Sequence, residues 1–309
     1  MVKASFHPYE LELHDKALYG IPLAGSMGKI WEKIIPAAIN DLTVHIFGEL
    51  GTEKEETAKA IHELGRLRGN FTYQNSQDTD LYNKLSGSRY STTSTKEGMS
   101  PLFKSRNGTL FLDNIDGMDS RSQIYIEESL RNEKFRLEGE PIQYSLTSRL
   151  VTGSNTNLAR CNIRDDLRAR LGYVEIGIPA LRNRGDEFDT TVKLACVNSK
   201  EHGYFKVDDK ALKLLKQYDW PGNVIELQNA VETAIVTHEG SSDILTFADF
   251  KFMIRKMVGR IPSEDRDGQE QQKLFLQLVL AAHENIETAA KALGLDVKEL
   301  RRKIQHFAL

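Results

Sequence analysis

The stretch Gly48–Glu55, which reads GELGTEKE, decides how this chain folds, because an apolar run precedes it and a helical pattern follows it. It nearly matches the phosphate-binding pattern G-x-x-x-x-G-K-[ST], with Gly48 and Lys54 in register. Glu53 stands where the pattern has its second glycine, the residue that lets backbone N–H groups wrap a phosphate. Two like charges about 4 Å apart repel by roughly 4 kcal/mol at an effective dielectric near 20, or about three decades of affinity. The stretch therefore predicts a nucleotide-hydrolysing scaffold whose phosphate loop has lost its chemistry.

The segments around this loop predict a parallel α/β sheet. Residues 42–47 read as a short buried strand, and residues 55–64 read as the helix that follows the loop. Further strands are expected at 108–113, 146–154 and 173–178, with helices at 27–38 and 120–131. Strands that alternate with helices are typical of a parallel sheet covered by helices.

Composition limits the class of protein. The chain has 309 residues, a net charge of −3, 40% hydrophobic and 28% charged residues, which fits two globular domains and an accessory module. Any surface for nucleic acid must be local, because the whole chain is not basic. Cys161 and Cys196 lack the spacing of a zinc site or a disulfide framework, and no apolar run is long enough to cross a membrane. We therefore expect a cytoplasmic protein with reduced cysteines, no resident metal and no membrane contact.

The domain boundaries follow from shifts in pattern along the chain. From about residue 188 the pattern becomes all helical, interrupted at Trp220-Pro-Gly-Asn, and a charged stretch poor in apolar residues comes later. The expected parts are an N-terminal arm at 1–19, an α/β core at 20–187, a helical domain at 188–258, a linker at 259–272 and a helical end at 273–309.

The second expected strand ends in FLDNID, which places Asp113 where nucleotide hydrolases hold Mg²⁺. Asn114 follows it, and an amide cannot accept a proton at neutral pH, so general-base catalysis is lost. The alternative is a core strand followed by a turn. The next strand ends at Asn155, which fits a sensor of a terminal phosphate and equally a turn or cap residue.

The run IRDDLRARL at 163–171 carries Arg164, Arg168 and Arg170. Arginine forks suit the phosphates of a neighbouring subunit. The same arginines could instead pair with Asp165 and Asp166 on an exposed helical face, and the sequence leaves both interpretations open.

The C-terminal end predicts two short helices. Residues 286–293 have an apolar face, Gly294 marks a turn, and Asp296 is a good N-cap for a second helix with Leu300 on its apolar side. Lys298–Leu309 holds four basic residues and one acid. This pattern predicts a helix-turn-helix with a basic recognition helix, against the alternative of a helical hairpin whose basic face is only solvated. The residues expected to contact DNA are Thr288, Lys298, Arg301, Arg302 and Lys303.

Taken together, the motifs resemble the bacterial enhancer-binding proteins, AAA+ activators of sigma-54 RNA polymerase with a Fis-type DNA-binding end. The resemblance runs from about residue 20 to the C-terminus and rests, in order, on GELGTEKE, NGTLFLDNI, SNTNL, IRDDLRARL and WPGNVIELQNAVE. It implies an AAA+ core, a helical lid, ring assembly through arginine fingers, and dimeric DNA binding.

The resemblance also defines where this sequence departs from the family. It implies a degenerate nucleotide site at Gly48, Gly51, Thr52, Glu53, Lys54, Asp113, Asn114, Asn155, Arg164, Arg170 and Ile225. Ile225 stands where the family has a lid arginine that senses the γ-phosphate. The loop that contacts sigma-54 should lie near Ser91–Lys96, which reads STTSTK and lacks the family motif.

These observations predict a DNA-binding transcription regulator, at least dimeric, that neither hydrolyses ATP nor depends on sigma-54. It would work with the housekeeping polymerase or as a repressor, and ATP is disfavoured as a ligand. We further expect the Glu53 carboxylate to pair with Lys54 or with loop N–H groups. The alternatives are a weak ATPase that assembles on DNA and a receptor for another nucleotide, such as a cyclic dinucleotide held by Arg164, Arg168 or Arg170.

Overall fold

The structure is a computed structural model that describes residues 16–87, 100–199, 204–250, 285–293 and 295–307, and isolated positions at 253, 273, 276, 277, 279 and 280. The described residues fall into two compact units, one within Asp15–Glu187 and one within Phe188–Leu309. The predicted linker at 259–272 and the segment Ser91–Lys96 lie outside the described residues. Among the described helices, none is both long and apolar enough to cross a lipid bilayer.

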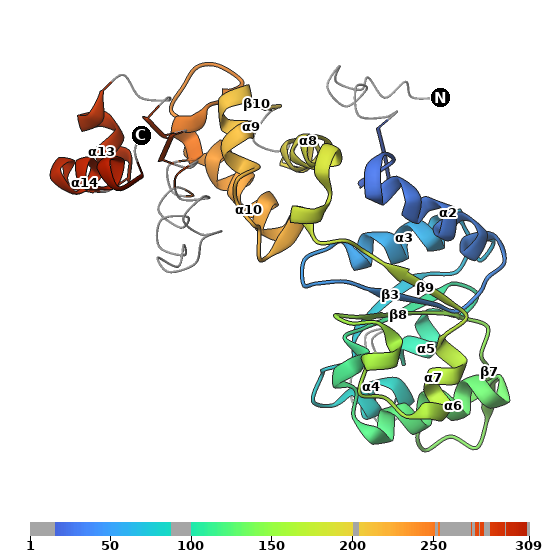
Figure 1. The fold of residues 1–309 in the computed structure, drawn as a ribbon. Coiled ribbons are helices and arrows are strands. Elements are labelled where there is room, and N and C mark those ends of the chain that lie inside the picture. Colours follow the sequence, from blue (N-terminus) through green and yellow to red (C-terminus); the bar gives the residue numbers. More distant parts are fainter. Residues whose placement is uncertain are drawn as a thin grey trace, which may run out of the picture. The chain divides into compact units, whose positions relative to one another are not determined.

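The first unit is built on a five-stranded parallel sheet, which confirms the α/β prediction (Figure 1). Its strands, in spatial order, are β4 (Phe71–Asn75), β5 (Thr109–Asp113), β8 (Arg149–Ser154), β3 (Val44–Phe47) and β9 (Val174–Gly177). Each pairs with its neighbour in parallel. The carboxyl ends of the strands therefore meet at one edge, which collects the loops after β3, β5 and β8.

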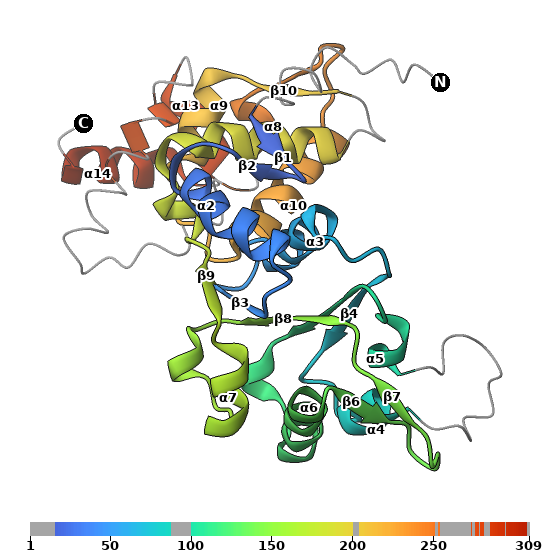
Figure 2. The same cartoon turned by 90° about the vertical axis from the view of Figure 1, so that its right-hand side faces the viewer.

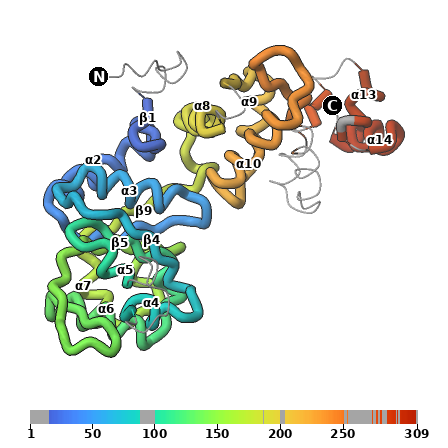
Figure 3. The backbone as a smooth tube through the Cα atoms, turned by 180° about the vertical axis from the view of Figure 1, so that it is seen from behind, coloured from blue at the N-terminus to red at the C-terminus, as the bar shows by residue number. Residues whose placement is uncertain are grey.

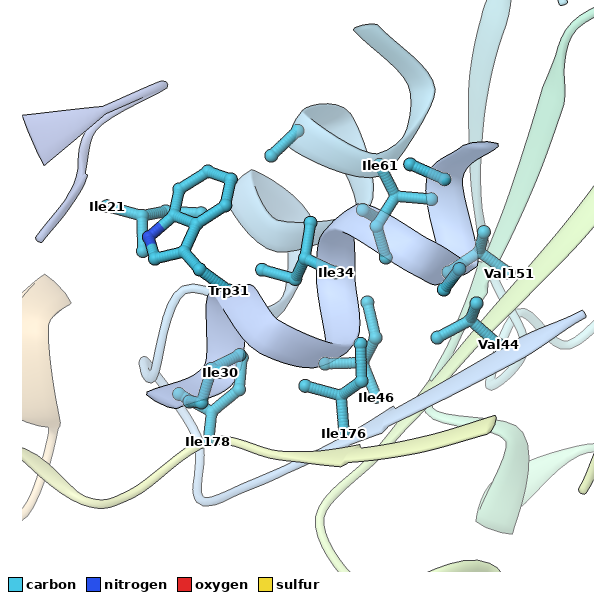
Figure 4. Close-up of a cluster of buried hydrophobic side chains, with 14 of the residues drawn as sticks. Ile21, Ile30, Trp31, Ile34, Val44, Ile46, Ile61, Val151, Ile176 and Ile178 are labelled. Atoms are coloured by element: carbon cyan, nitrogen blue, oxygen red, sulfur yellow. The ribbon is translucent and has the colours of Figure 1, made fainter. Parts of the chain in front are cut away.

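Helices cover both faces of this sheet (Figure 2). On one face lie α2 (Gly25–Ile39) and α3 (Lys54–Leu64), whose buried residues pack against the sheet in the cluster of Figure 4. Ile34, Val44, Ile46 and Ile61 are fully buried in it. The other helices of the unit are α4 (Leu81–Ser86), α5 (Pro101–Lys104), α6 (Ser120–Asn132) and α7 (Asp165–Leu171). Members of this set, with strand residues such as Leu110 and Leu112, form a second cluster.

Two short antiparallel hairpins complete the unit: β1 (Ala17–Leu18) with β2 (Ile21–Pro22), and β6 (Lys134–Arg136) with β7 (Gln143–Ser145). The expected strand at 146–154 is shorter than predicted, because residues 146–148 connect β7 to β8. The expected helices at 27–38 and 120–131 are present as α2 and α6.

The second unit begins with a helical domain that contains α8 (Phe188–Asn198), α9 (Asp209–Leu215) and α10 (Asn223–Val236). Trp220 breaks the helical pattern with a φ of 49° and is fully buried, stacked edge-on against Tyr218. The prediction that this region is all helical is wrong in one respect: β10 (Lys206–Val207) pairs in parallel with β11 (Ile244–Leu245).

The described C-terminal residues form α13 (Ile286–Leu293) and α14 (Val297–Phe307), which pack against each other (Figure 3). Ala289, Ala290 and Leu293 on α13 and Leu300 on α14 are buried, as their spacing predicts. Asp296 Oδ1 accepts a hydrogen bond from the Lys298 N–H at 3.0 Å, so the predicted N-cap residue satisfies the start of α14.

Candidate nucleotide-binding loop

The loop between β3 and α3 is held in one conformation by its small residues. A Cβ on Gly48 would lie 2.7 Å from the Ile178 carbonyl oxygen, so only glycine allows this approach. Gly51 has a φ of 80°, and the Thr52 hydroxyl donates to the Glu49 carbonyl at 2.7 Å. Gly48, Gly51 and Thr52 therefore shape the loop through their own contacts.

Glu53 occupies a backbone conformation that favours glycine. It caps the N-terminus of α3 with a φ of 67° and a ψ of 34°, in the left-handed region. That conformation costs an ordinary L-residue about 1–2 kcal/mol. Glu53 therefore holds a backbone conformation that a glycine at this position could also adopt.

The Glu53 side chain forms a buried ion pair with Arg184. Arg184 Nη1 lies 2.6 Å from Glu53 Oε2, and the two side chains are 0% and 7% exposed. Arg184 also donates to the carbonyl oxygens of Pro179 at 3.2 Å and Thr52 at 3.4 Å. The expectation that Glu53 pairs with Lys54 or loop N–H groups is wrong, because an arginine 131 residues away takes the carboxylate instead.

This pairing changes the electrostatic argument about the loop. Burial raises the pKa of the Glu53 carboxyl, and the Arg184 charge opposes that rise. A phosphate near the loop would meet a nearly neutral pair rather than a lone anion. The repulsion of roughly 4 kcal/mol, which assumed an unpaired carboxylate, is therefore too large.

A second ion pair joins the same two segments. Arg182 donates through Nη1 to Glu49 Oε2 at 2.8 Å and through Nη2 to the other carboxylate oxygen, in the two-pronged geometry that suits arginine. Arg182 and Arg184, which we call the arginine clamp, thus hold the two loop glutamates.

Lys54 directs its ammonium group into the loop. Its Nζ donates to the carbonyl oxygens of Gly48 at 3.0 Å and Glu49 at 3.2 Å, and lies 3.5 Å from Asn155 Oδ1. Burial lowers the pKa of Lys54, while the charges of Asp113 and Asp116 oppose that shift. The structure thus brings together three predicted parts of the site: the loop, its lysine and Asn155.

Asp113 and Asn114 lie beside this group at the end of β5. Burial raises the pKa of Asp113, and the charge of Lys54 opposes the rise. Asn114 has a φ of 56°, and its side-chain N–H donates to Asn75 Oδ1 at 3.3 Å. Burial raises the pKa of the phenol of Tyr73, on β4, to about 12, and the negative charge of Asp113 adds to the rise. The residue after Asp113 is therefore an amide whose side chain contacts Asn75 on β4.

Arg164, the N-cap of α7, and the two arginines of that helix have partners within the chain. Arg164 contacts Asp166 through Nε at 3.0 Å, and this pairing lowers the pKa of Asp166 to about 2. Arg170 Nε lies 3.1 Å from Glu127 Oε1. Arg168 donates to the Ile163 carbonyl at 2.9 Å, which makes it a support for its own loop. Arg164 and Arg168 also pair with Asp166 and Asp165, as the exposed-face interpretation predicts, whereas Arg170 reaches the buried Glu127 of α6. A role across a subunit interface stays a prediction.

The remaining predicted site residues belong to the second unit. Ile225 lies in the first turn of α10 and is 54% exposed. The Thr288 N–H donates to Asn285 Oδ1 at 2.9 Å, so Asn285 caps α13. The basic residues of α14 reach the surface: Lys298, Arg301 and Arg302 are exposed and Lys303 is half-buried.

Sequence reasoning missed the arginine clamp, together with Asn75 and Tyr73 on β4. The sequence held one signal for the clamp. Two arginines follow the last strand at LRNR (181–184), and the loop before α3 carries two glutamates with only Lys54 as an adjacent cation. The connection joins segments far apart in the chain, so only the fold reveals it.

Two family descriptions match the sequence. The sigma-54 interaction domain matches residues 23–177, which is half of the 309-residue chain, and an AAA+ ATPase lid domain matches residues 193–265. The chain belongs to the sigma-54 interaction domain family. Its first unit and the helical domain after it are therefore an AAA+ core and lid.

Of three curated relatives of this sigma-54 interaction domain protein, two are named transcription regulators and one is named a hydroxylase. The DNA-binding transcriptional regulator NtrC of Rhizobium meliloti is 28% identical over 82% of this chain and 55% of its own length. The anaerobic nitric oxide reductase transcription regulator NorR of Escherichia coli O157:H7 is 28% identical over 94% of this chain and 62% of its own. A protein of Geobacillus stearothermophilus named limonene hydroxylase is 29% identical over 88% and 53%. The chain thus spans between half and two thirds of the length of these relatives.

Among solved structures, NtrX from Brucella abortus in complex with ADP superposes with a TM-score of 0.66 at 22% identity, covering 97% of this chain and 71% of its own. This likeness shows that the two chains share a fold.

Proposed function

We propose that this chain is a DNA-binding transcription regulator whose AAA+ core acts without ATP hydrolysis and without sigma-54. The observation that carries the proposal is that Glu49, Glu53 and Lys54 of the loop all have partners within the chain. Glu49 is held by Arg182, Glu53 by Arg184, and Lys54 by two loop carbonyls and Asn155. A phosphate loop normally balances its lysine and amides with a bound anion. Here a nucleotide would have to displace existing contacts first.

Asn114 supports the absence of hydrolysis. Its amide replaces the acid expected after Asp113 and hydrogen-bonds Asn75 rather than pointing a base at a water site. Even a chain that binds ATP would then lack the group that activates the attacking water.

The DNA-binding part of the proposal rests on α14. Lys298, Arg301 and Arg302 are exposed on it, opposite the buried Leu300, and α13 precedes it as the first helix of a helix-turn-helix would. NtrC is named a DNA-binding regulator, which supports the same assignment. A homodimer would read two half-sites about 34 Å apart or a multiple of that spacing.

Independence from sigma-54 rests on the sequence STTSTK at 91–96, and the polymerase would then be the housekeeping form.

The test is ATP turnover and calorimetry on the purified chain. We expect wild type to match the variant Lys54→Ala in turnover, since neither should hydrolyse ATP. Glu53→Gly/Arg184→Leu restores the pattern glycine and removes the cation that Glu53 neutralises, and it should bind ATP at least about tenfold more tightly, which corresponds to roughly 1.4 kcal/mol. Turnover by wild type that Lys54→Ala abolishes would overturn the proposal.

One observation favours a second candidate, a receptor that binds a nucleotide without hydrolysing it. Lys54, Asp113 and Asn155 still meet at one edge of the sheet, and solved structures of NtrX are complexes with ADP and with ATP. A thermal-shift series with ATP, ADP and cyclic dinucleotides separates the candidates. A rise in melting temperature that Lys54→Ala removes would favour the receptor.

A further inference from the structure

Two loops meet at the amino ends of β4 and β5, at the edge of the sheet opposite the phosphate loop. The Gly69 N–H donates to the Asn107 carbonyl at 2.6 Å, and the Thr109 N–H donates to the Asn70 carbonyl at 3.1 Å. A Cβ on Gly69 would lie 2.2 Å from the Arg106 carbonyl oxygen, so glycine is needed for this approach. Residues 65–70 and 104–108 therefore lie side by side, and α5, which ends at the start of the second loop, contacts β4 (Figure 2).

The two loops carry basic side chains and no acidic ones. Residues 65–70 read GRLRGN and residues 104–108 read KSRNG, so the two loops contain four basic residues and no acid. Arg66, Arg68 and Arg106 are exposed and Lys104 is half-buried. We call these four residues the amino-edge patch. The preceding acid along the chain is Glu63, in the last turn of α3.

The arginines of the patch differ from others in the same unit. Arg164, Arg170 and the arginine clamp all form ion pairs with carboxylates. Among the described residues, Arg66 and Arg68 form neither an ion pair nor a hydrogen bond, and Arg106 lies over the Phe103 ring at 5.3 Å. Neighbouring like charges repel each other, and an anionic partner bound to the patch would lower that repulsion.

The chemistry of the patch fits phosphates. Guanidinium groups bind phosphate oxygens in a fork, and Asn70 and Asn107 add amide groups that can hydrogen-bond the same backbone. Lys104 has a further interaction within the chain, so the argument rests on the three arginines. Three exposed guanidinium groups on two adjoining loops match a polymer with evenly spaced phosphates better than a single small anion.

We propose that the amino-edge patch contacts the sugar–phosphate backbone of duplex DNA, as a second, sequence-independent surface. The choice of DNA rests on the proposed function, because a chain bound through α14 would hold duplex DNA at high local concentration near its other surfaces. The patch then adds affinity and salt dependence but no sequence preference.

The experiment measures affinity of the full chain for a random-sequence duplex of about 40 base pairs, by fluorescence anisotropy between about 50 and 200 mM salt. The test variant is Arg66→Ala/Arg68→Ala/Arg106→Ala, which truncates three exposed side chains. The matched control is Lys29→Ala/Lys59→Ala/Arg160→Ala, which removes the same charge from exposed positions on α2, on α3 and after β8. Arg66→Lys/Arg68→Lys/Arg106→Lys keeps the charge of the patch.

We expect the alanine variant to bind about tenfold or more weakly at low salt, with a salt slope shallower by about 0.9 for each phosphate that the protein no longer neutralises. The control and the lysine variant should keep the wild-type slope. Equal slopes for the alanine variant and the control would overturn the second surface and leave the proposed function intact. If the chain still binds DNA after Arg301→Ala/Arg302→Ala but no longer binds in the patch variant, α14 is not the helix that docks on DNA. Absence of any binding by wild type would overturn both.

Discussion

At the scale of single residues, Glu53 combines a backbone conformation that favours glycine with a charged side chain. It has a left-handed φ, and its carboxylate is neutralised by Arg184 in the interior. A buried ion pair contributes little net stability, yet breaking it by removing one partner leaves an uncompensated charge. The pair is therefore a strong constraint on both positions.

Arg184→Leu should lower the free energy of unfolding by about 3–5 kcal/mol, measured by urea denaturation, because Glu53 would be buried without a partner. The matched control is Arg182→Leu in the half-exposed pair with Glu49, which should cost about 0–1 kcal/mol. Similar losses in the two variants would contradict the buried pair.

The same variant should respond to pH. Without Arg184, burial raises the pKa of Glu53 with no cation to oppose it. A raised carboxyl pKa means that the folded state binds the proton more tightly, so stability is present below the unfolded pKa and is lost as pH rises through the folded pKa. Arg184→Leu should therefore be more stable near pH 5 than near pH 8, and Glu53→Gln/Arg184→Leu should lose that dependence.

The residues of the site that sequence could name are those carried by local motifs. Gly48, Lys54 and Asp113 follow strands whose apolar runs are evident, and parallel pairing brings them to one edge. The partner of Glu53 could not be named, because residues 131 apart become neighbours only through the whole sheet. The inference of simple charge repulsion failed for the same reason.

At the scale of elements, His238 joins the end of α10 to the turn that follows it. Its Nδ1 lies 2.9 Å from Asp249 Oδ1 and its Nε2 lies 3.0 Å from the Ser242 carbonyl oxygen. A carbonyl oxygen and an ionised carboxylate accept hydrogen bonds and do not donate them, so both ring nitrogens carry a proton. The hydrogen bond to Asp249 raises the pKa of His238, which fits a charged imidazolium.

This pair of hydrogen bonds predicts a pH dependence of lid stability. Because the folded pKa is raised, its contribution is fully present below the unfolded value of about 6.5 and is lost as pH rises through the folded pKa. His238→Gln should cost about 1–3 kcal/mol at pH 6 and less at pH 9, measured by thermal melts followed at both pH values. A cost that does not change between them would contradict a charged His238.

Elements differ in how well sequence predicts them. The long amphipathic helices α2 and α6 follow from the 3.6-residue spacing of their apolar residues. The pairs β6–β7 and β10–β11 have strands of two or three residues, which are too short to show an alternating pattern, so the sequence does not predict them.

At the scale of the whole molecule, the sequence family accounts for the AAA+ core and lid, while the role of the C-terminal helices is a proposal. Arg301→Ala/Arg302→Ala should weaken binding to duplex DNA and reduce the salt slope by about 0.9 for each phosphate left without its cation. Lys291→Ala on α13 is a single-charge control on the neighbouring helix. An unchanged slope in the double variant would argue that α14 does not dock on DNA.

The left-handed backbone at position 53 has a consequence for how this protein can change. Glutamate and glycine codons differ by one nucleotide, and the glycine would enter a conformation already shaped for it. What opposes glycine at position 53 is the guanidinium of Arg184, which would be buried without a partner. In a library randomised at both positions and sorted for soluble expression, glycine at 53 should therefore accumulate together with an uncharged side chain at 184, so that two mutations separate this loop from the phosphate-binding pattern.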